Sequence, residues 1–161
     1  MITLSVKQPW AYLICQGIKN IENRTWKLPE KYKGKRVLIH ASLSTQLDGI
    51  ALYEYLTESQ IQCISLNIPD YCKQRWMHGA IIGSVVISDC VINHPSIWAE
   101  KTQISAFHDV LDDLKLLGRV IPPHPITYNW VLSDPILFDQ PILDVKGKLN
   151  FWEYNGKIPE L

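Results

Sequence analysis

A long apolar segment interrupted by a glycine constrains the fold more than any other feature of the sequence. Residues 80–92 are rich in β-branched and apolar side chains and predict a strand. Gly83 interrupts this run. A glycine inside a strand often marks a bend or a bulge, because it allows the backbone to come close to a neighbour. A bent strand of this kind is typical of a small barrel.

Further short strands are predicted along the chain, with helices inserted between them. The expected strands cover residues 2–6, 20–26, 36–42, 127–133 and 136–144, and a turn at 146–148 then leads to residues 151–153. The expected helices cover residues 9–16, 44 or 45 to about 56, part of 57–77 with a break near Pro69, and 104–117. The segment 29–34 and the prolines between 122 and 125 predict loops.

This order of elements lacks the regular strand–helix alternation and the glycine-rich phosphate loop of a Rossmann-type sheet. We therefore expect an α+β fold with about six mixed or antiparallel strands in a small β-barrel surrounded by helices. The length of 161 residues predicts a single domain over residues 1–161.

Composition excludes several classes of protein. The chain is 47% hydrophobic and 20% charged, which is typical of a globular protein. No apolar run reaches the ~18 residues of a membrane helix, and the N-terminus reads directly into a strand rather than a signal peptide. We expect a soluble, cytoplasmic protein. The four cysteines form no C-x-x-C pair and the five histidines lack metal-ligand spacing, so free thiols and no metal or cofactor are expected.

The net charge of zero conceals an uneven distribution. Residues 1–36 carry eight Lys and Arg against two Glu, a net charge of +6, and the remaining residues carry −6. One face of such a chain could attract a polyanion. The alternative is that the lysines of 31–35 only solvate a turn.

Several blocks of sequence resemble those of one known family. Residues 17–24 read Gly17-Ile-Lys19-Asn-Ile-Glu22-Asn-Arg24, which matches the pattern G-x-K-x-x-E-x-R. Residues 4–11 resemble the opening L-S-x-K-Q-P-W-A of that family, 36–42 its V-x-I-H-A-S strand and 79–91 its G-x-I-x-G-x-V strand. The segments around 130–152 resemble its closing strands. The chain is thus similar over its whole length to the ASCH family (activating signal cointegrator homology) of the PUA-like superfamily.

This resemblance implies a barrel of about six strands with helices around it and a cleft where the motif's helix–strand junction meets the barrel. It also implies nucleic acid, most often RNA, as the ligand class. Some small members are hydrolases that act on acetylated cytidine or on RNA. In the acetylcytidine-cleaving members a Thr follows the Lys by three residues, whereas this chain has Glu22 in that position.

The motif residues themselves suggest a chemistry. On a strand, residues 22 and 24 share one face, so Glu22 and Arg24 can enter one cleft that Lys19 reaches from the turn. An adjacent Lys and Arg can hold a phosphate or a carboxylate. Glu22 can accept from a base amino group or act as a general base near Lys19, so Lys19 and Glu22 are the candidate catalytic residues. The alternative is a structural ion pair that fixes the junction.

Polar residues outside the motif complete the candidate ligand-binding set. Lys7 and Gln8 precede the predicted helix N-terminus, which attracts anions, and a Gln can hydrogen-bond a base edge. His40 and Ser42 alternate on one face of a predicted strand. In each case the alternative is structural: a solvated Lys, a Gln that ties down a loop and a His satisfied within the core.

Aromatic residues are candidate platforms for stacking bases. Trp26 lies two residues beyond the motif, on what we expect to be the same strand face, so it is predicted to line the cleft. Tyr128 and Trp130 share a face and are further candidates, as is Trp152. Trp10 lies on the apolar face of a short helix and is predicted to belong to the core.

Three functions follow from these observations. The first is an RNA- or nucleotide-binding domain with a basic cleft at the motif. The second is a small hydrolase of modified cytidine nucleosides or of RNA. The third is a protein-interaction adaptor with a protein partner. The predicted helical insertions 44–77 and 96–118 could either cover the cleft or form a dimer contact.

Overall fold

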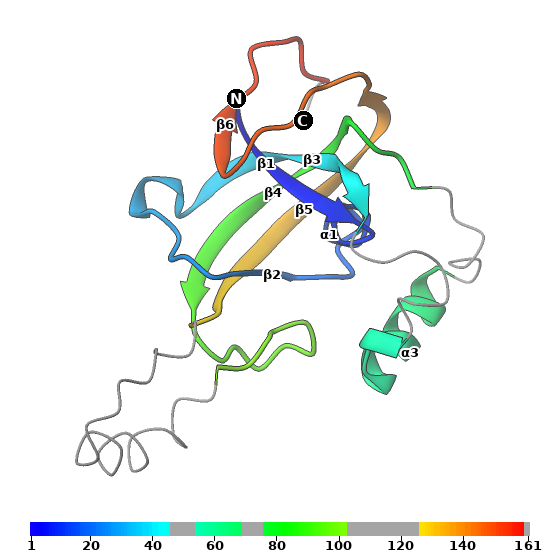
Figure 1. Cartoon of the computed structure of the whole chain (residues 1–161), viewed down its shortest axis with the longest axis vertical. Helices are drawn as coiled ribbons and strands as arrows, with labels where there is room; N and C mark the ends of the chain where they lie inside the picture. The colour runs from blue at the N-terminus through cyan, green and yellow to red at the C-terminus, as the bar shows by residue number, and fades with distance from the viewer. Residues whose placement is uncertain (46–53, 69–75, 103–125, 160–161) are drawn as a thin grey trace, which may run out of the picture.

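Six strands form one curled, mixed sheet in the part of the chain that the structure describes. The computed structural model describes residues 1–45, 54–68, 76–102 and 126–159. The strand order is β2-β5-β4-β3-β1-β6, and the sheet curls into a half-barrel (Figure 1). This confirms the predicted α+β class and the small barrel. The elements are β1 (Ile2–Gln8), α1 (Trp10–Cys15), β2 (Ile21–Arg24), η1 (Glu30–Tyr32), β3 (Lys35–Thr45), α3 (Glu58–Asn67), β4 (Ala80–Val91), β5 (Tyr128–Ile142) and β6 (Phe151–Glu153).

Curling brings two strands together that are far apart in the strand order. β1 pairs in parallel with β3, whereas the other described neighbours in the sheet are antiparallel. β2 forms one edge of the sheet, and β1 is next to the opposite edge. Nevertheless, Arg24 at the end of β2 donates from Nη2 to the backbone oxygen of Ser5 in β1 over 3.0 Å. This hydrogen bond joins the two sides of the half-barrel across its open seam.

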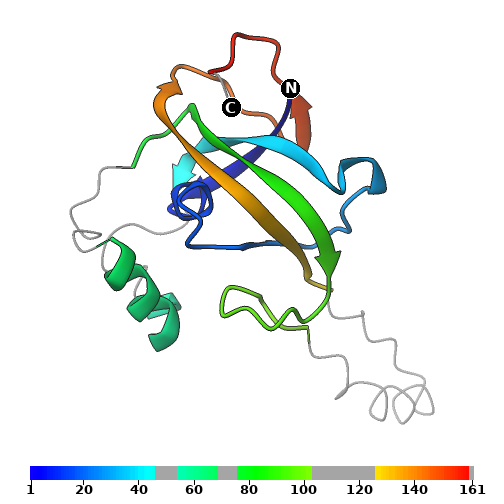
Figure 2. The same cartoon turned by 180° about the vertical axis from the view of Figure 1, so that it is seen from behind.

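Helix α1 packs against the curled sheet, where it contacts β1, β3, β4 and β5. Its residues Ala11, Leu13, Ile14 and Cys15 are buried. Leu13 extends the core outward, because it clusters with Ile21, Ile64 of α3 and Trp98. Figure 2 shows α1 against the sheet and α3 outside it, so this smaller cluster attaches α3 beside β2.

The predicted irregularity at Gly83 is confirmed. The register of β4 shifts next to Gly83 against both neighbours: His40 pairs with Ile81 while Ile39 pairs with Gly83, and Ile142 pairs with Ile81 while Leu137 pairs with Gly83. Such a shift increases the local bend of a strand. The long strand β4 can therefore follow the curvature of the barrel.

One predicted boundary was wrong. The segments 127–133 and 136–144 belong to one continuous strand, β5, because its register with β4 shifts between Ser84 and Val86 and accommodates Pro135. Pro is tolerated in a sheet at such an irregularity. β3 continues through Ser44 and Thr45, with Thr45 opposite Gln8 of β1, and the start of the helix predicted after these residues lies outside the described residues.

One inserted helix is confirmed within the predicted segment 57–77. Thr57 caps α3, because its hydroxyl accepts from the Gln60 backbone N–H while the Gln60 side chain accepts from the Thr57 N–H. Such a reciprocal cap stabilises a helix start. The expected helix over 104–117, the loop at 122–125 and most of the expected helix before residue 54 lie outside the described residues.

Two smaller expectations concern the membrane and the cysteines. Within the described ranges, none of the helices combines the length and the apolar character needed to cross a membrane. Cys15, Cys63 and Cys90 are free thiols, and Cys72 lies outside the described residues.

Candidate functional site

A groove with a volume of about 730 Å³ follows the open seam of the half-barrel. Its walls come from β1, from β2, from the start of α3 and from the loop 96–100. The lining residues that matter below are Ser5, Lys7, Trp10, Lys19, Glu22, Arg24, Tyr55, Trp98, Glu100 and Leu149. The volume is within the range of about 300–1,000 Å³ that small-molecule sites occupy.

The three charged residues of the motif meet in this groove. Glu22 lies between two cations: Oε2 is 3.6 Å from Lys19 Nζ, and Oε1 is 2.9 Å from Arg24 Nε. Lys19 also donates to the backbone oxygen of Ile21. The ion pair with Arg24 lacks the alignment of a hydrogen bond, and the guanidinium uses Nη2 to reach Ser5. Glu22 and Arg24, which strand alternation predicted to share a face, therefore line the same groove.

Burial gives this cluster its electrostatic character. Lys19 is only 5% exposed and Glu22 only 7%, whereas Arg24 is partly exposed. Burial lowers the pKa of Lys19, and the adjacent Glu22 carboxylate opposes that shift. Loss of water around an ammonium disfavours its charged form, and a close carboxylate favours it. An amine in this setting is more readily deprotonated than a surface lysine.

Trp10 lies beside the charged cluster rather than wholly within the core. It is partly exposed and lines the groove, with Lys19 Nζ 5.7 Å from the centroid of its ring. Its ring also packs edge to face against Trp98 at 6.3 Å. Trp10 thus packs against the core, as predicted, while part of its ring remains exposed in the groove, because α1 lies at the rim of the seam.

The other predicted stacking residues lie outside the groove. Trp130 is 0% exposed, and its ring is stacked on Phe151 at 5.3 Å, contacted by Trp26 at 4.6 Å and covered by the Arg24 guanidinium at 5.9 Å. It therefore has no free face for a base. Trp26 and Tyr128 are partly buried and pack against the same core, and Trp152 is buried in a separate cluster.

Two of the predicted polar residues have structural partners instead. Gln8 is fully buried; its Nε2 donates to the Met77 backbone oxygen, and its Oε1 accepts from the Tyr12 N–H. Both ends of its amide are therefore used within the fold. His40 is buried and its Nε2 lies 2.9 Å from the Val145 backbone oxygen, so this nitrogen is the donor. Burial lowers the pKa of His40.

Lys7 and Ser42 do line the groove, as does Lys19. Lys7 is exposed and Ser42 is partly buried, with its hydroxyl donating to the Ser44 backbone oxygen over 3.0 Å. The structure thus brings together Lys7, Lys19, Glu22, Arg24 and Ser42 of the predicted set and keeps Gln8, Trp26, His40, Tyr128 and Trp130 apart from it.

The start of the predicted insertion 96–118 forms one wall of the groove, and its described part, residues 96–102, is a loop rather than a helix. Asn23 donates to the Trp98 backbone oxygen and accepts from the Glu100 N–H. Asn129, which is fully buried, donates to Asn23 Oδ1 and to the Glu100 backbone oxygen and accepts from the His94 N–H. The sequence does contain a signal for this contact, namely asparagines within predicted strands, because a buried side-chain amide requires hydrogen-bond partners. The partners themselves could not be identified from the sequence.

We expect Asn129→Leu to lower the free energy of unfolding by about 2 kcal/mol, because the substitution removes the three hydrogen bonds that this buried amide makes to Asn23, His94 and Glu100. The loss should be measured by urea unfolding followed by tryptophan fluorescence. Asn155→Leu is the matched control, because Asn155 is exposed. Equal urea midpoints for the two variants would contradict the conclusion that the hydrogen bonds of Asn129 hold this loop in place.

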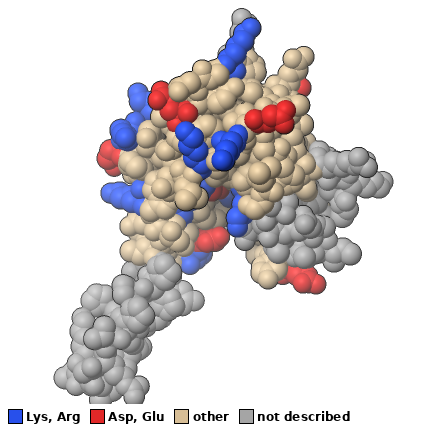
Figure 3. Space-filling view, turned by 45° about the horizontal axis from the view of Figure 1, so that its top comes forward, with Lys and Arg blue, Asp and Glu red and all other residues tan. Residues whose placement is uncertain are grey.

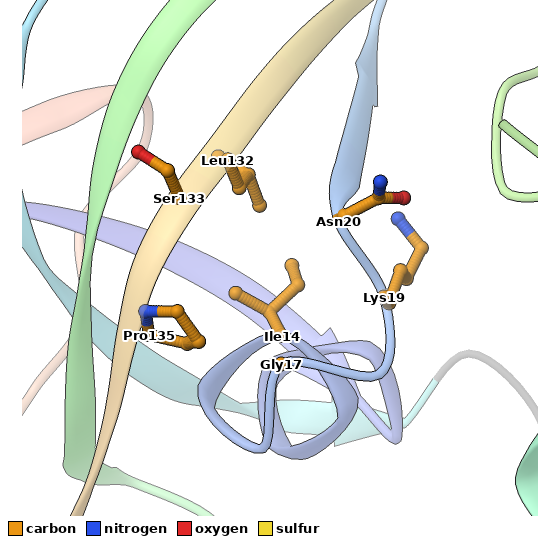
Figure 4. A pocket seen from close by; sticks show the side chains of 7 residues that line it. All are labelled: Ile14, Gly17, Lys19, Asn20, Leu132, Ser133 and Pro135. Atoms are coloured by element: carbon orange, nitrogen blue, oxygen red, sulfur yellow. The ribbon is translucent and has the colours of Figure 1, made fainter. Parts of the chain in front are cut away.

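A smaller hollow of about 40 Å³ lies behind Lys19 (Figure 4). Ile14 and Gly17 at the end of α1, Asn20 before β2, and Leu132, Ser133 and Pro135 of β5 line it with Lys19. Gly17 has φ +76°, and a Cβ there would lie 2.9 Å from Pro135 Cγ. The Gly of the motif therefore allows both the left-handed helix exit and the close approach to β5.

A comparison with protein-family models assigns the chain to a family. A family model described as the ASCH domain matches residues 4–141. Among solved structures, the chain resembles the "Crystal structure of ASCH from Zymomonas mobilis", with 13% sequence identity and a TM-score of 0.47, over 88% of this chain and 72% of that one. No significant match is found among curated proteins.

Proposed function

Because this chain belongs to the ASCH domain family, we propose that its groove binds single-stranded RNA or a nucleotide. The observation that carries the proposal is the position of the motif: Lys19, Glu22 and Arg24 line the same groove as the exposed Lys7. Cations that face a groove can bind phosphate, and Glu22 can accept a hydrogen bond from a base amino group.

Aromatic side chains in the groove support the same proposal. Trp10 is partly exposed next to Lys19, and Tyr55 is 75% exposed at the opposite wall. Aromatic rings bind bases of any sequence by stacking, typically with about 1–3 kcal/mol per base. A groove that combines cations and aromatic rings matches the chemistry of a nucleotide better than that of a simple anion.

Hydrolysis is the second candidate, because the lowered pKa of Lys19 and its contact with Glu22 provide an acid–base pair in a groove. We rank it second because this chain has Glu22 where the acetylcytidine-cleaving members have a Thr, and because Lys19 is only 5% exposed and already donates to the Ile21 backbone oxygen. Thr25, the nearest hydroxyl along the chain, is exposed and does not line the groove.

We expect the double variant Lys7→Gln/Arg24→Gln to bind a short single-stranded RNA about tenfold more weakly at moderate salt, because it removes two cations that face the phosphates. The slope of log affinity against log salt concentration should fall by about two. Quenching of tryptophan fluorescence, measured at low and at moderate salt, reports the binding.

The matched control is Lys35→Gln/Lys157→Gln, which changes the net charge equally at exposed positions outside the groove. Equal loss in both double variants would mean that only net charge matters and would contradict the groove as the site. If the unmodified protein cleaves the RNA and Glu22→Gln does not, hydrolysis rather than binding would be the function of the groove. Absence of any binding, with recovery of a protein partner, would favour an adaptor.

A further inference from the structure

The loop 144–150 between β5 and β6 is held in one conformation by residues of the barrel (Figure 1). His40 Nε2 lies 2.9 Å from the Val145 backbone oxygen, and the Val145 N–H donates to the Gly79 backbone oxygen over 2.8 Å. A Cβ on Gly147 would lie 2.4 Å from Cε1 of His40, so the loop backbone rests directly on that ring.

The backbone at both ends of this loop adopts an uncommon conformation. Asp144 and Asn150 both have φ +57°. Asp and Asn tolerate this left-handed region better than other residues with a Cβ, although it still has an energetic cost. Residues kept in such conformations by their surroundings often occur at functional sites.

What this anchored loop exposes is suited to a nucleic-acid strand. Leu149 is 90% exposed and lines the groove, and Lys146 and Lys148 are exposed beside it. Figure 3, with this end of the molecule turned toward the viewer, shows Lys and Arg side chains close together near the middle of the face, with Asp and Glu side chains on either side of them. Lys148 Nζ lies 5.9 Å from the centroid of the Trp152 ring. An exposed apolar side chain next to a Lys can contact a base while the cation contacts an adjacent phosphate.

Ser5 connects this loop directly to the charged cluster of the motif. Its backbone oxygen accepts from Arg24 Nη2 over 3.0 Å, and its hydroxyl donates to the Lys148 backbone oxygen over 2.9 Å. The same hydroxyl accepts from Trp152 Nε1 over 3.1 Å. A single residue of β1 therefore separates the motif from the loop, and the two surfaces are continuous.

We infer that the loop 144–150 is a second subsite, which holds the nucleotides of a single strand that leave the groove. The inference rests on the proposed function and extends it: the ligand is a strand of several nucleotides and not a free nucleotide. Arg24 and Lys7 bind the part of the strand inside the groove, Leu149 contacts the base that leaves it, and Lys148 binds the phosphate beyond it.

The experiment compares two probes, uridine monophosphate and a single-stranded RNA of eight uridines, with the unmodified protein and with Lys148→Gln/Leu149→Ser. We expect the variant to bind the longer probe about tenfold more weakly, with a salt slope lower by about one, and to bind the monophosphate as the unmodified protein does. The matched control, Lys157→Gln/Leu66→Ser, alters an exposed Lys and an exposed Leu outside the groove.

The other outcomes overturn the inference in different ways. Equal affinity of the variant and the unmodified protein for the longer probe would mean that the loop makes no contact. Equal loss for both probes would assign the loop to the groove itself rather than to a second subsite. If Lys7→Gln/Arg24→Gln weakens both probes while the loop variant weakens neither, the proposed function stands and this inference falls; if neither probe binds the unmodified protein, both fall.

Discussion

Replacing Gly83 with alanine should lower the free energy of unfolding by about 3 kcal/mol or more, because the new methyl group has no space. A Cβ at this position would lie 2.2 Å from the backbone oxygen of Ile136 and 2.7 Å from Cys15 Sγ. The Ile136 oxygen belongs to β5, the partner strand of β4, and Cys15 belongs to the buried face of α1. Neither can move without disturbing the sheet or the helix that packs on it.

Gly34→Ala is the matched control for this expectation. Gly34 has φ +71° but nothing within 4 Å of the position of a Cβ, so only the backbone cost of about 1 kcal/mol applies. Urea unfolding of both variants separates crowding from backbone conformation. If Gly83→Ala unfolds at the same urea concentration as Gly34→Ala, then β5 and α1 do not approach β4 as closely at Gly83 as described here. Loss of a cooperative transition in the Gly83 variant alone would agree with it.

Strand boundaries could be predicted where the local sequence pattern determines them, but not where pairing with a distant strand determines them. Gly83 within an apolar run was sufficient to predict an irregular strand. By contrast, residues 127–133 and 136–144 were predicted as two strands, whereas β5 continues through both because the register with β4 shifts next to Pro135. A pairing partner that is distant in sequence overrides local preference here.

Part of the candidate site could also be predicted, because Glu22 and Arg24 obey strand alternation. The same rule failed for Trp26, since β2 ends at Arg24 and alternation does not continue beyond a strand. Trp130 pairs directly with Glu22 and so shares its face of the sheet, but lies beneath Arg24 in the core. Alternation assigns a face of the sheet, whereas depth within a curled sheet depends on which distant side chains cover that face.

Replacing Glu22 with Gln should lower the free energy of unfolding by about 3 kcal/mol near neutral pH, because it leaves two adjacent cations without their carboxylate. Glu22 is only 7% exposed, and it lies 3.6 Å from Lys19 Nζ and 2.9 Å from Arg24 Nε. The buried Lys19 depends most on this contact, since it is itself only 5% exposed. Urea unfolding measures the loss, and Glu30→Gln, at an exposed position, is the matched control.

The pH dependence distinguishes this explanation from simple loss of packing. Burial lowers the pKa of Lys19 in the folded protein, and Glu22 limits that shift. Without the carboxylate, the pKa of Lys19 in the folded protein falls further. Over part of the range from about pH 7 to about pH 10, the folded Glu22→Gln variant therefore binds fewer protons than the folded unmodified protein does. The stability of the unmodified protein therefore decreases relative to that of the variant as pH rises, and the difference between them narrows.

A second substitution tests the same cause at constant pH. In Lys19→Met/Glu22→Gln the cation that most needs the carboxylate is absent, so the double variant should recover part of the stability that Glu22→Gln loses. A loss that is independent of pH and additive with Lys19→Met would instead assign Glu22 to packing alone. The motif would then maintain the junction between α1 and β2 by shape, and the charged cluster would contribute nothing beyond it. Under the ion-pair explanation, by contrast, the Glu22 carboxylate opposes the effect of burial and favours the charged form of Lys19.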